Sequence, residues 1–193
     1  WSCHHGISRW KEQCACTTNS KWKKPFRDGL DQLAEALDQI YVDYIKTYAI
    51  DSWELRNQFI KVKLGQMDLD ELRKGVFGLD CDEEKTKRIS LLLAAQYERQ
   101  RMFTSCGWFF DEFARIEPKN NVRYAAQAVW LTRKATGDDV SDLACEVLGK
   151  VISSRTGLSA DAVFDDHIER LNHVDEYLLE MFLPKRPKKI SNW

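Results

Sequence analysis

Residues 30–48 read LDQLAEALDQIYVDYIKTY, and this stretch decides the fold class. Its large apolar residues recur every three or four positions, at Leu30, Leu33, Leu37, Ile40, Tyr44 and Tyr48. Residues with this spacing share one face of an α-helix. The stretch therefore predicts one long amphipathic helix.

Further helices are predicted along most of the remaining chain. They are expected at residues 53–64, 68–73, 82–104, 122–136, 140–151, from 160 onward and at 174–182. Residues typical of helix boundaries separate these segments, and they are Asp51 or Ser52, Gly65, Asp82, Gly137, Ser159 and Pro184. The unbroken apolar run over residues 91–95 indicates that the helix over 82–104 is central.

The pattern of the whole chain favours a single helical domain. No segment alternates apolar and polar residues as a half-buried strand does, and no repeat of fixed length is visible. We therefore predict an all-α helical bundle over residues 1–193. An irregular segment rich in cysteine, histidine and tryptophan spans 1–25, helices span 26–183, and a basic tail spans 184–193. Because the sequence begins at Trp1, we expect a fragment of a larger protein.

The composition excludes several classes of partner. Hydrophobic residues make up 44% of the chain and charged residues 31%, as in an ordinary globular domain. No run of about 18 apolar residues appears, so no membrane partner is expected. The formal net charge of -1 gives no general attraction for nucleic acid. The basic residues around Trp22 are therefore expected to be solvated at the entry to the first helix.

Cysteine and histidine are concentrated near the amino terminus. Six cysteines are too few for a scaffold built on disulfides, yet more than a helical core needs. We therefore expect reduced thiols and a cytoplasmic protein. The candidate metal ligands are Cys3, His4, His5, Cys14 and Cys16, with Cys106 available from a second irregular segment.

Four thiolates, or three thiolates and an imidazole, bind tetrahedral zinc, and thiolates also bind iron–sulfur clusters. The spacing is unusual for a zinc module, because ten residues separate Cys3 from the Cys14-x-Cys16 pair. Two alternatives remain open. The cysteines can be reduced side chains packed beneath a loop, or Cys3 can form a disulfide with Cys14 or Cys106.

Tryptophan is abundant in the same two irregular segments, at Trp1, Trp10, Trp22 and Trp108. Indole rings stack on the apolar faces of sugars, while polar neighbours hydrogen-bond to hydroxyl groups. The polar candidates are His5, Arg9, Asp111 and Glu112. A carbohydrate site is one interpretation of this pattern, and packing in the core is the alternative for each tryptophan.

The sequence contains no recognised catalytic motif. Nucleophile elbows, zinc-protease motifs, phosphate-binding glycine loops and dinucleotide fingerprints are all missing from it. Asp111 and Glu112 would diverge by about 100 degrees on a helix, which makes them a poor acid/base pair. No catalytic residue is therefore assigned.

Two segments resemble a known family. They are WSCHHGISRWKEQCAC over residues 1–16 and MFTSCGWFFDE over residues 102–112. Both are similar to the carboxy-terminal helical domain of unknown function in proteins of glycoside hydrolase family 57, the α-amylase-like and α-mannosidase-like enzymes. The resemblance covers most of the chain. It implies an upstream β/α barrel that carries the two catalytic carboxylates of a retaining α-glycosidase.

The resemblance implies an accessory role for the helical domain. The domain would form one wall of a site for an α-glucan or another oligosaccharide, with contacts from Trp1, His5, Arg9, Trp10, Trp108 and Asp111. The shared cysteines favour a common site for zinc or an iron–sulfur cluster, formed by Cys3, Cys14, Cys16 and Cys106. The alternative function is a structural or assembly module that a thiolate metal site stabilises.

Overall fold

The computed structural model describes residues 3–76, 78 and 82–173. Across this part of the chain the secondary structure is helical, apart from two isolated β-bridges, and the predicted all-α class is confirmed. The helix predicted at 174–182 and the tail at 184–193 lie outside the described residues. The elements in chain order are η1 Ser8–Trp10, α1 Lys23–Lys46, α2 Ser52–Lys63, η2 Glu71–Val76, α3 Glu83–Arg101, α4 Cys106–Phe109, α5 Ile116–Thr136, α6 Ser141–Leu148 and α7 Ala160–Asn172.

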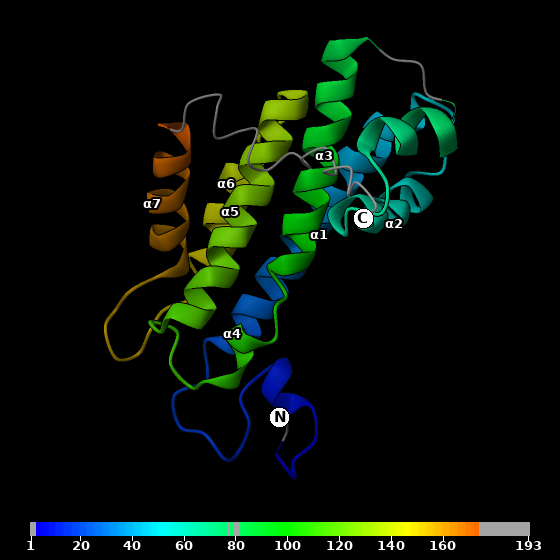
Figure 1. The fold of residues 1–193 in the computed structure, drawn as a ribbon. Helices are drawn as coiled ribbons and strands as arrows, with labels where there is room; N and C mark the ends of the chain where they lie inside the picture. The colour runs from blue at the N-terminus through cyan, green and yellow to red at the C-terminus, as the bar shows by residue number, and fades with distance from the viewer. Residues whose placement is uncertain (1–2, 77, 79–81, 174–193) are drawn as a thin grey trace, which may run out of the picture.

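Three long helices, α1, α3 and α5, form the centre of the bundle (Figure 1). α5 packs against α1, α3, α4 and α7, while α1 also packs against α2, α3 and α6. The buried faces form two hydrophobic clusters, one around Trp22, Phe26 and Phe113 and the other around Tyr41, Phe59 and Trp130. Among the described residues, no helix has the length and apolar character that crossing a membrane requires.

Local signals place most of the helix boundaries. Asp51, and not Ser52, caps α2 by accepting hydrogen bonds from two backbone N–H groups. Asp82 caps α3 by accepting one such bond. Gly137 ends α5 with a φ of 87°, in the left-handed region that glycine enters without steric cost. Ser159 occupies the N-cap position of α7, but its side chain makes no capping hydrogen bond.

Two elements differ from the sequence-based expectation. α1 begins at Lys23, inside the segment predicted to be irregular, because Pro25 falls in the first turn, where a backbone N–H has no helical partner to lose. The short helix predicted at 68–73 is helical from Leu69, but from Glu71 it continues as the π-helical η2, Glu71–Val76. The Asp68 carboxylate marks the helical start, because it accepts a hydrogen bond of 2.7 Å from the N–H of Glu71.

The connection between α3 and α5 holds α4 close against α5. Asn121 of α5 donates from Nδ2 to the carbonyl oxygen of Thr104 at 3.0 Å. Gly107 of α4 lies directly over this amide group. The Trp108 side chain is 2% exposed, and its ring centroid lies 5.1 Å from that of Phe26. α4 is therefore fixed by a tight backbone approach and by aromatic packing.

We expect Gly107→Ala to destabilise the fold by about 1–3 kcal/mol, the usual cost of overpacking. The added Cβ would lie 2.5 Å from Asn121 Nδ2, so the amide would have to move away from Thr104. The free energy of unfolding in urea measures the effect. Gly75→Ala is the control, because its Cβ would come no closer than 3.8 Å to another group. Equal stability of both variants and the wild type would contradict the argument.

Candidate metal centre

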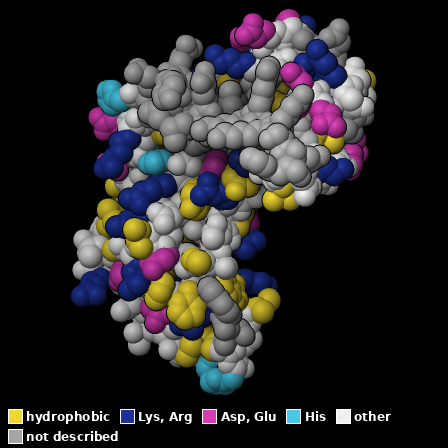
Figure 2. All heavy atoms as spheres, in the orientation of Figure 1, with side chains coloured by type: hydrophobic (Ala, Val, Ile, Leu, Met, Phe, Trp, Pro, Cys, Tyr) yellow, Lys and Arg dark blue, Asp and Glu magenta, His cyan; other side chains and the backbone are white. Residues whose placement is uncertain are grey.

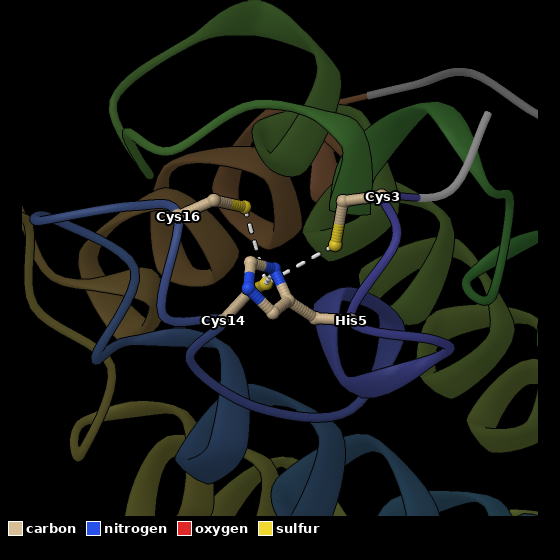
Figure 3. Close-up of side chains that lie close together, drawn as sticks. All are labelled: Cys3, His5, Cys14 and Cys16. Carbon is tan, nitrogen blue, oxygen red and sulfur yellow. Dashed lines mark hydrogen bonds between the residues drawn. The ribbon is translucent and has the colours of Figure 1, made fainter.

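Three cysteines and one histidine converge in the amino-terminal segment (Figure 3). Cys14 is central: its Sγ lies 3.2 Å from Cys3 Sγ, 3.1 Å from Cys16 Sγ and 3.5 Å from His5 Nδ1. The four ligand atoms all lie within 4.8 Å of one another. Cys14 is buried, Cys3 is half-buried, and His5 and Cys16 are exposed. The group therefore lies at the surface, with its central thiol inside the protein.

Two tight turns bring these side chains together. The N–H of Gly6 donates to the carbonyl oxygen of Cys3 at 3.1 Å, and Gly6 has a φ of 82° that suits glycine. This turn folds His5 back beside Cys3. In the second turn, the N–H and the hydroxyl of Thr17 both donate to the carbonyl oxygen of Cys14 at 3.0 Å. The convergence thus follows from local backbone geometry at both ends of the segment.

The thiols of the cluster differ in their tendency to ionise. The backbone N–H of Cys16 donates to the Cys14 sulfur, and with the neighbouring thiols it lowers the pKa of Cys14. The hydrogen bond with Cys14 and burial raise the pKa of Cys16 to about 11. The Cys14 sulfur therefore ionises more readily than the Cys16 sulfur, which suits a group that binds a cation.

The donor set fits one zinc ion, and its atoms are close enough to share one. Structural zinc prefers cysteine sulfur and histidine nitrogen in a tetrahedral arrangement. Zn–S bonds of about 2.3 Å place two sulfur ligands about 3.8 Å apart. The sulfurs of Cys3 and Cys16 lie 3.2 and 3.1 Å from Cys14 Sγ, so binding one ion requires them to move outward by roughly 0.6 Å. A cluster of several irons and sulfides needs wider spacing of its cysteines. The geometry therefore favours a single ion.

The structure brings together three of the four predicted metal ligands. Cys3, Cys14 and Cys16 belong to the cluster, whereas Cys106 is exposed on α4 and lies outside it. His5, expected to contact sugar, takes the fourth position. The sequence signal for this set is the pair of short spacings, Cys3-x-His5 and Cys14-x-Cys16.

The described cysteines are all free, so none of the disulfides considered from the sequence is formed. Cys145 lies apart from the cluster, and its Sγ donates to the Asp165 carboxylate at 3.2 Å. Burial and this carboxylate raise the pKa of Cys145 to about 12, so it remains a protonated thiol near neutral pH. Cys145 is a packing residue.

The residues predicted to contact sugar differ in how exposed their side chains are. Trp108 is a core residue, and its ring is covered by aromatic neighbours. Arg9 and Asp111 form a partly exposed ion pair at 3.3 Å, and Trp10 is half-buried. Trp1 lies outside the described residues. The surface candidates in the described chain are therefore His5, Arg9, Trp10 and Asp111.

Polar contacts join the amino-terminal segment to the segment around α4. The Arg9 guanidinium pairs with Asp111, and the indole N–H of Trp22 donates to the Asp111 carbonyl oxygen at 2.9 Å. Lys23 Nζ donates to the carbonyl oxygen of Trp108 at 2.7 Å. The sequence pattern predicts a solvated basic entry to the first helix, but Lys23 is completely buried. No local signal distinguishes Lys23 from its exposed neighbour Lys24.

Burial lowers the pKa of Lys23 to about 8, with a further contribution from Arg9 and opposition from Asp111, Cys14 and Cys16. A lysine whose pKa falls on folding costs stability while it stays protonated in both states. In the metal-free chain, this cost is therefore complete below about pH 8 and disappears as the pH rises toward the ordinary value of 10.5.

We expect the unfolding free energy of the metal-free wild type to rise relative to that of Lys23→Met across this pH window. Urea unfolding of both proteins in chelator, below pH 8 and near pH 10.5, measures the difference. Other thiols and tyrosines titrate in both proteins, so their contributions largely cancel. A difference that stays constant with pH would show that the Lys23 ammonium carries no such cost.

The comparisons with known proteins identify the helical part of the chain. No curated protein and no solved structure matches it. A family model described as a domain of unknown function, DUF3536, matches residues 19–173. This range begins after the cysteine cluster and runs from the entry of α1 to the end of α7. Because the match covers most of the sequence, the chain belongs to the DUF3536 family.

Proposed function

We propose that Cys3, His5, Cys14 and Cys16 bind one zinc ion, and that this ion fixes the amino-terminal segment to the helical bundle. The observation that carries the proposal is the convergence of four ligand atoms within 4.8 Å. Thiolate sulfur and imidazole nitrogen are the preferred donors of structural zinc. Four protein ligands leave no open coordination position, so the role of the ion is structural.

Apolar burial contributes little to the position of residues 3–16. Cys14 is the one buried residue in this described range, and Ile7 is 62% exposed. A segment with so little buried surface does not offset its loss of conformational entropy by packing. A metal that binds the folded arrangement alone adds its binding free energy to folding. The proposed ion therefore acts as the cross-link of this segment, in a reducing compartment such as the cytoplasm.

We expect the purified chain to hold about one zinc ion, as a site with four protein ligands does. Cys14→Ser should abolish binding because it removes the central sulfur. His5→Ala should weaken binding, whereas Cys106→Ser should leave it unchanged, because Cys106 lies outside the cluster. Elemental analysis and competition with a chromophoric chelator measure stoichiometry and affinity.

Cys106→Ser serves as the matched control for the loss of a thiol. A wild-type chain that holds no zinc would reject the site. Loss of zinc in Cys106→Ser with full retention in His5→Ala would reject the ligand set and favour four thiolates.

We propose a second role for the surface beside the cluster, as the accessory wall of a carbohydrate site in an enzyme similar to glycoside hydrolase family 57. The partly exposed Arg9–Asp111 pair lies at this surface, with Phe109 37% exposed beneath the Arg9 guanidinium. Figure 2 shows hydrophobic side chains exposed at the lower end of the molecule, where Figure 1 places the amino-terminal segment. Aromatic and charged groups in this combination suit an α-glucan or another oligosaccharide.

In this role the chain positions substrate, and an upstream barrel domain performs the chemistry. The DUF3536 match names no activity. The proposal therefore rests on two grounds: the resemblance of residues 1–16 and 102–112 to proteins of glycoside hydrolase family 57, and the side chains at this surface. Trp108 does not contribute a stacking face, because it is buried.

We expect maltooligosaccharides to produce a saturable change in tryptophan fluorescence of the wild type, because Trp10 lies at this surface. Phe109→Ala should weaken the response by roughly 1 kcal/mol, the value of one aromatic contact. Ile116→Ala is the control, since Ile116 is an exposed apolar residue at the start of α5. The absence of a saturable response in the wild type would contradict the carbohydrate role.

A further inference from the structure

Lys23 is a buried charge with few partners. Its side chain is inaccessible to solvent, and its Nζ donates a hydrogen bond of 2.7 Å to the carbonyl oxygen of Trp108. An ammonium group has three N–H donors. Among the residues that the structure describes, no carboxylate forms an ion pair with Lys23. Removing such a charge from water is costly unless a negative charge lies nearby.

The neighbouring ion pair does not provide that negative charge. Arg9 and Asp111 pair with each other at 3.3 Å, so their effects on Lys23 oppose one another. The other groups whose charges act on Lys23 are Cys14 and Cys16. Besides the Trp108 carbonyl oxygen, the Trp22 ring lies near the ammonium, with its centroid 5.7 Å from Nζ. Neutral thiols would add no negative charge to these contacts, whereas thiolates would. The cysteine cluster is therefore the candidate source of a countercharge for Lys23.

A series of turns holds Lys23 in a fixed position relative to Cys14. Thr17 donates twice to the Cys14 carbonyl oxygen, and the hydroxyls of Thr17 and Ser20 hydrogen-bond to each other. The Ser20 carbonyl oxygen then accepts a bond of 3.0 Å from the backbone N–H of Lys23. Thr17 and Ser20 are both buried. The backbones of Cys14 and Lys23 are therefore linked through one series of hydrogen-bonded turns.

We propose that Lys23 is the buried countercharge of the metal centre, an inference that rests on the zinc site proposed above. Three thiolates, a neutral imidazole and one zinc ion carry one net negative charge, which attracts the Lys23 ammonium. The same ammonium binds the Trp108 carbonyl oxygen of α4. Lys23 thus couples zinc binding to the position of α4. It contacts neither the ion nor a reacting group, so it is a positioning residue.

The test compares the zinc affinity of the full chain with that of matched lysine variants. Lys23→Met removes the charge, and we expect its zinc affinity to fall about tenfold, within the range found for groups outside the ligand shell. Lys24→Met removes a charge from the next residue, which is exposed and pairs with Asp28. We expect this control to bind zinc as the wild type does. Lys23→Arg, which keeps the charge, should recover most of the affinity.

Cobalt(II) spectra separate an electrostatic effect from displacement of the ligands. Lys23→Met should give the wild-type ligand-field bands with weaker binding, because the same four side chains still bind the ion. If Lys23→Met does not fold, Lys23→Gln takes its place, since its amide N–H can still donate toward Trp108 without a charge.

The outcomes distinguish this inference from the zinc site itself. A wild-type chain that binds no zinc overturns both proposals. Zinc binding by the wild type with equal affinity in the uncharged Lys23 variant overturns the countercharge alone. Altered cobalt bands in that variant would show that the ligands have moved, and they too would overturn the electrostatic role.

Discussion

The close packing of α5 against α1, α3, α4 and α7 is the constraint on which the rest of the structure depends. Ala125, Ala126 and Ala128 on α5 are fully buried, and their small side chains let neighbouring helices approach closely. The same helix carries Asn121, whose amide lies against Gly107 and fixes α4. The carbonyl that Lys23 binds is therefore placed by contacts that begin in the centre of the bundle.

The sequence predicts those parts of the fold that depend on local interactions. The apolar period of residues 30–48 gives α1, and the carboxylates of Asp51 and Asp82 mark the starts of α2 and α3, because a cap acts on backbone groups within one turn. The predicted ligands Cys3, Cys14 and Cys16 also come together through two local turns, although their spacing is unusual for a zinc module. These features require no knowledge of how distant segments pack.

Features that depend on long-range packing were not predictable from spacing alone. Trp108 has the sequence context of a surface aromatic residue, but α1 and α5 cover its ring. Lys23 and Lys24 are adjacent, yet the start of α1 turns one into the protein and the other toward solvent. Cys106 is separated from the cluster because the approach of Gly107 to Asn121 fixes α4 in another position. In each case a tertiary contact decides the outcome.

The helical bundle and the amino-terminal segment are stabilised by different interactions. The DUF3536 match spans residues 19–173, whose helices are stabilised by the burial of continuous apolar clusters. Residues 3–16 make polar contacts with the segment that follows α4, including the Arg9–Asp111 pair, which carries a modest free energy at a wet surface. Lys23 lies between the amino-terminal segment and the helical bundle. Its side chain is buried, and the charges of Cys14 and Cys16 act on its ammonium group. A buried positive charge at this boundary is costly with neutral thiols and favourable with a thiolate–zinc centre. In the proposed zinc centre, the net negative charge would therefore act together with the coordination bonds to hold the amino-terminal segment on the helices.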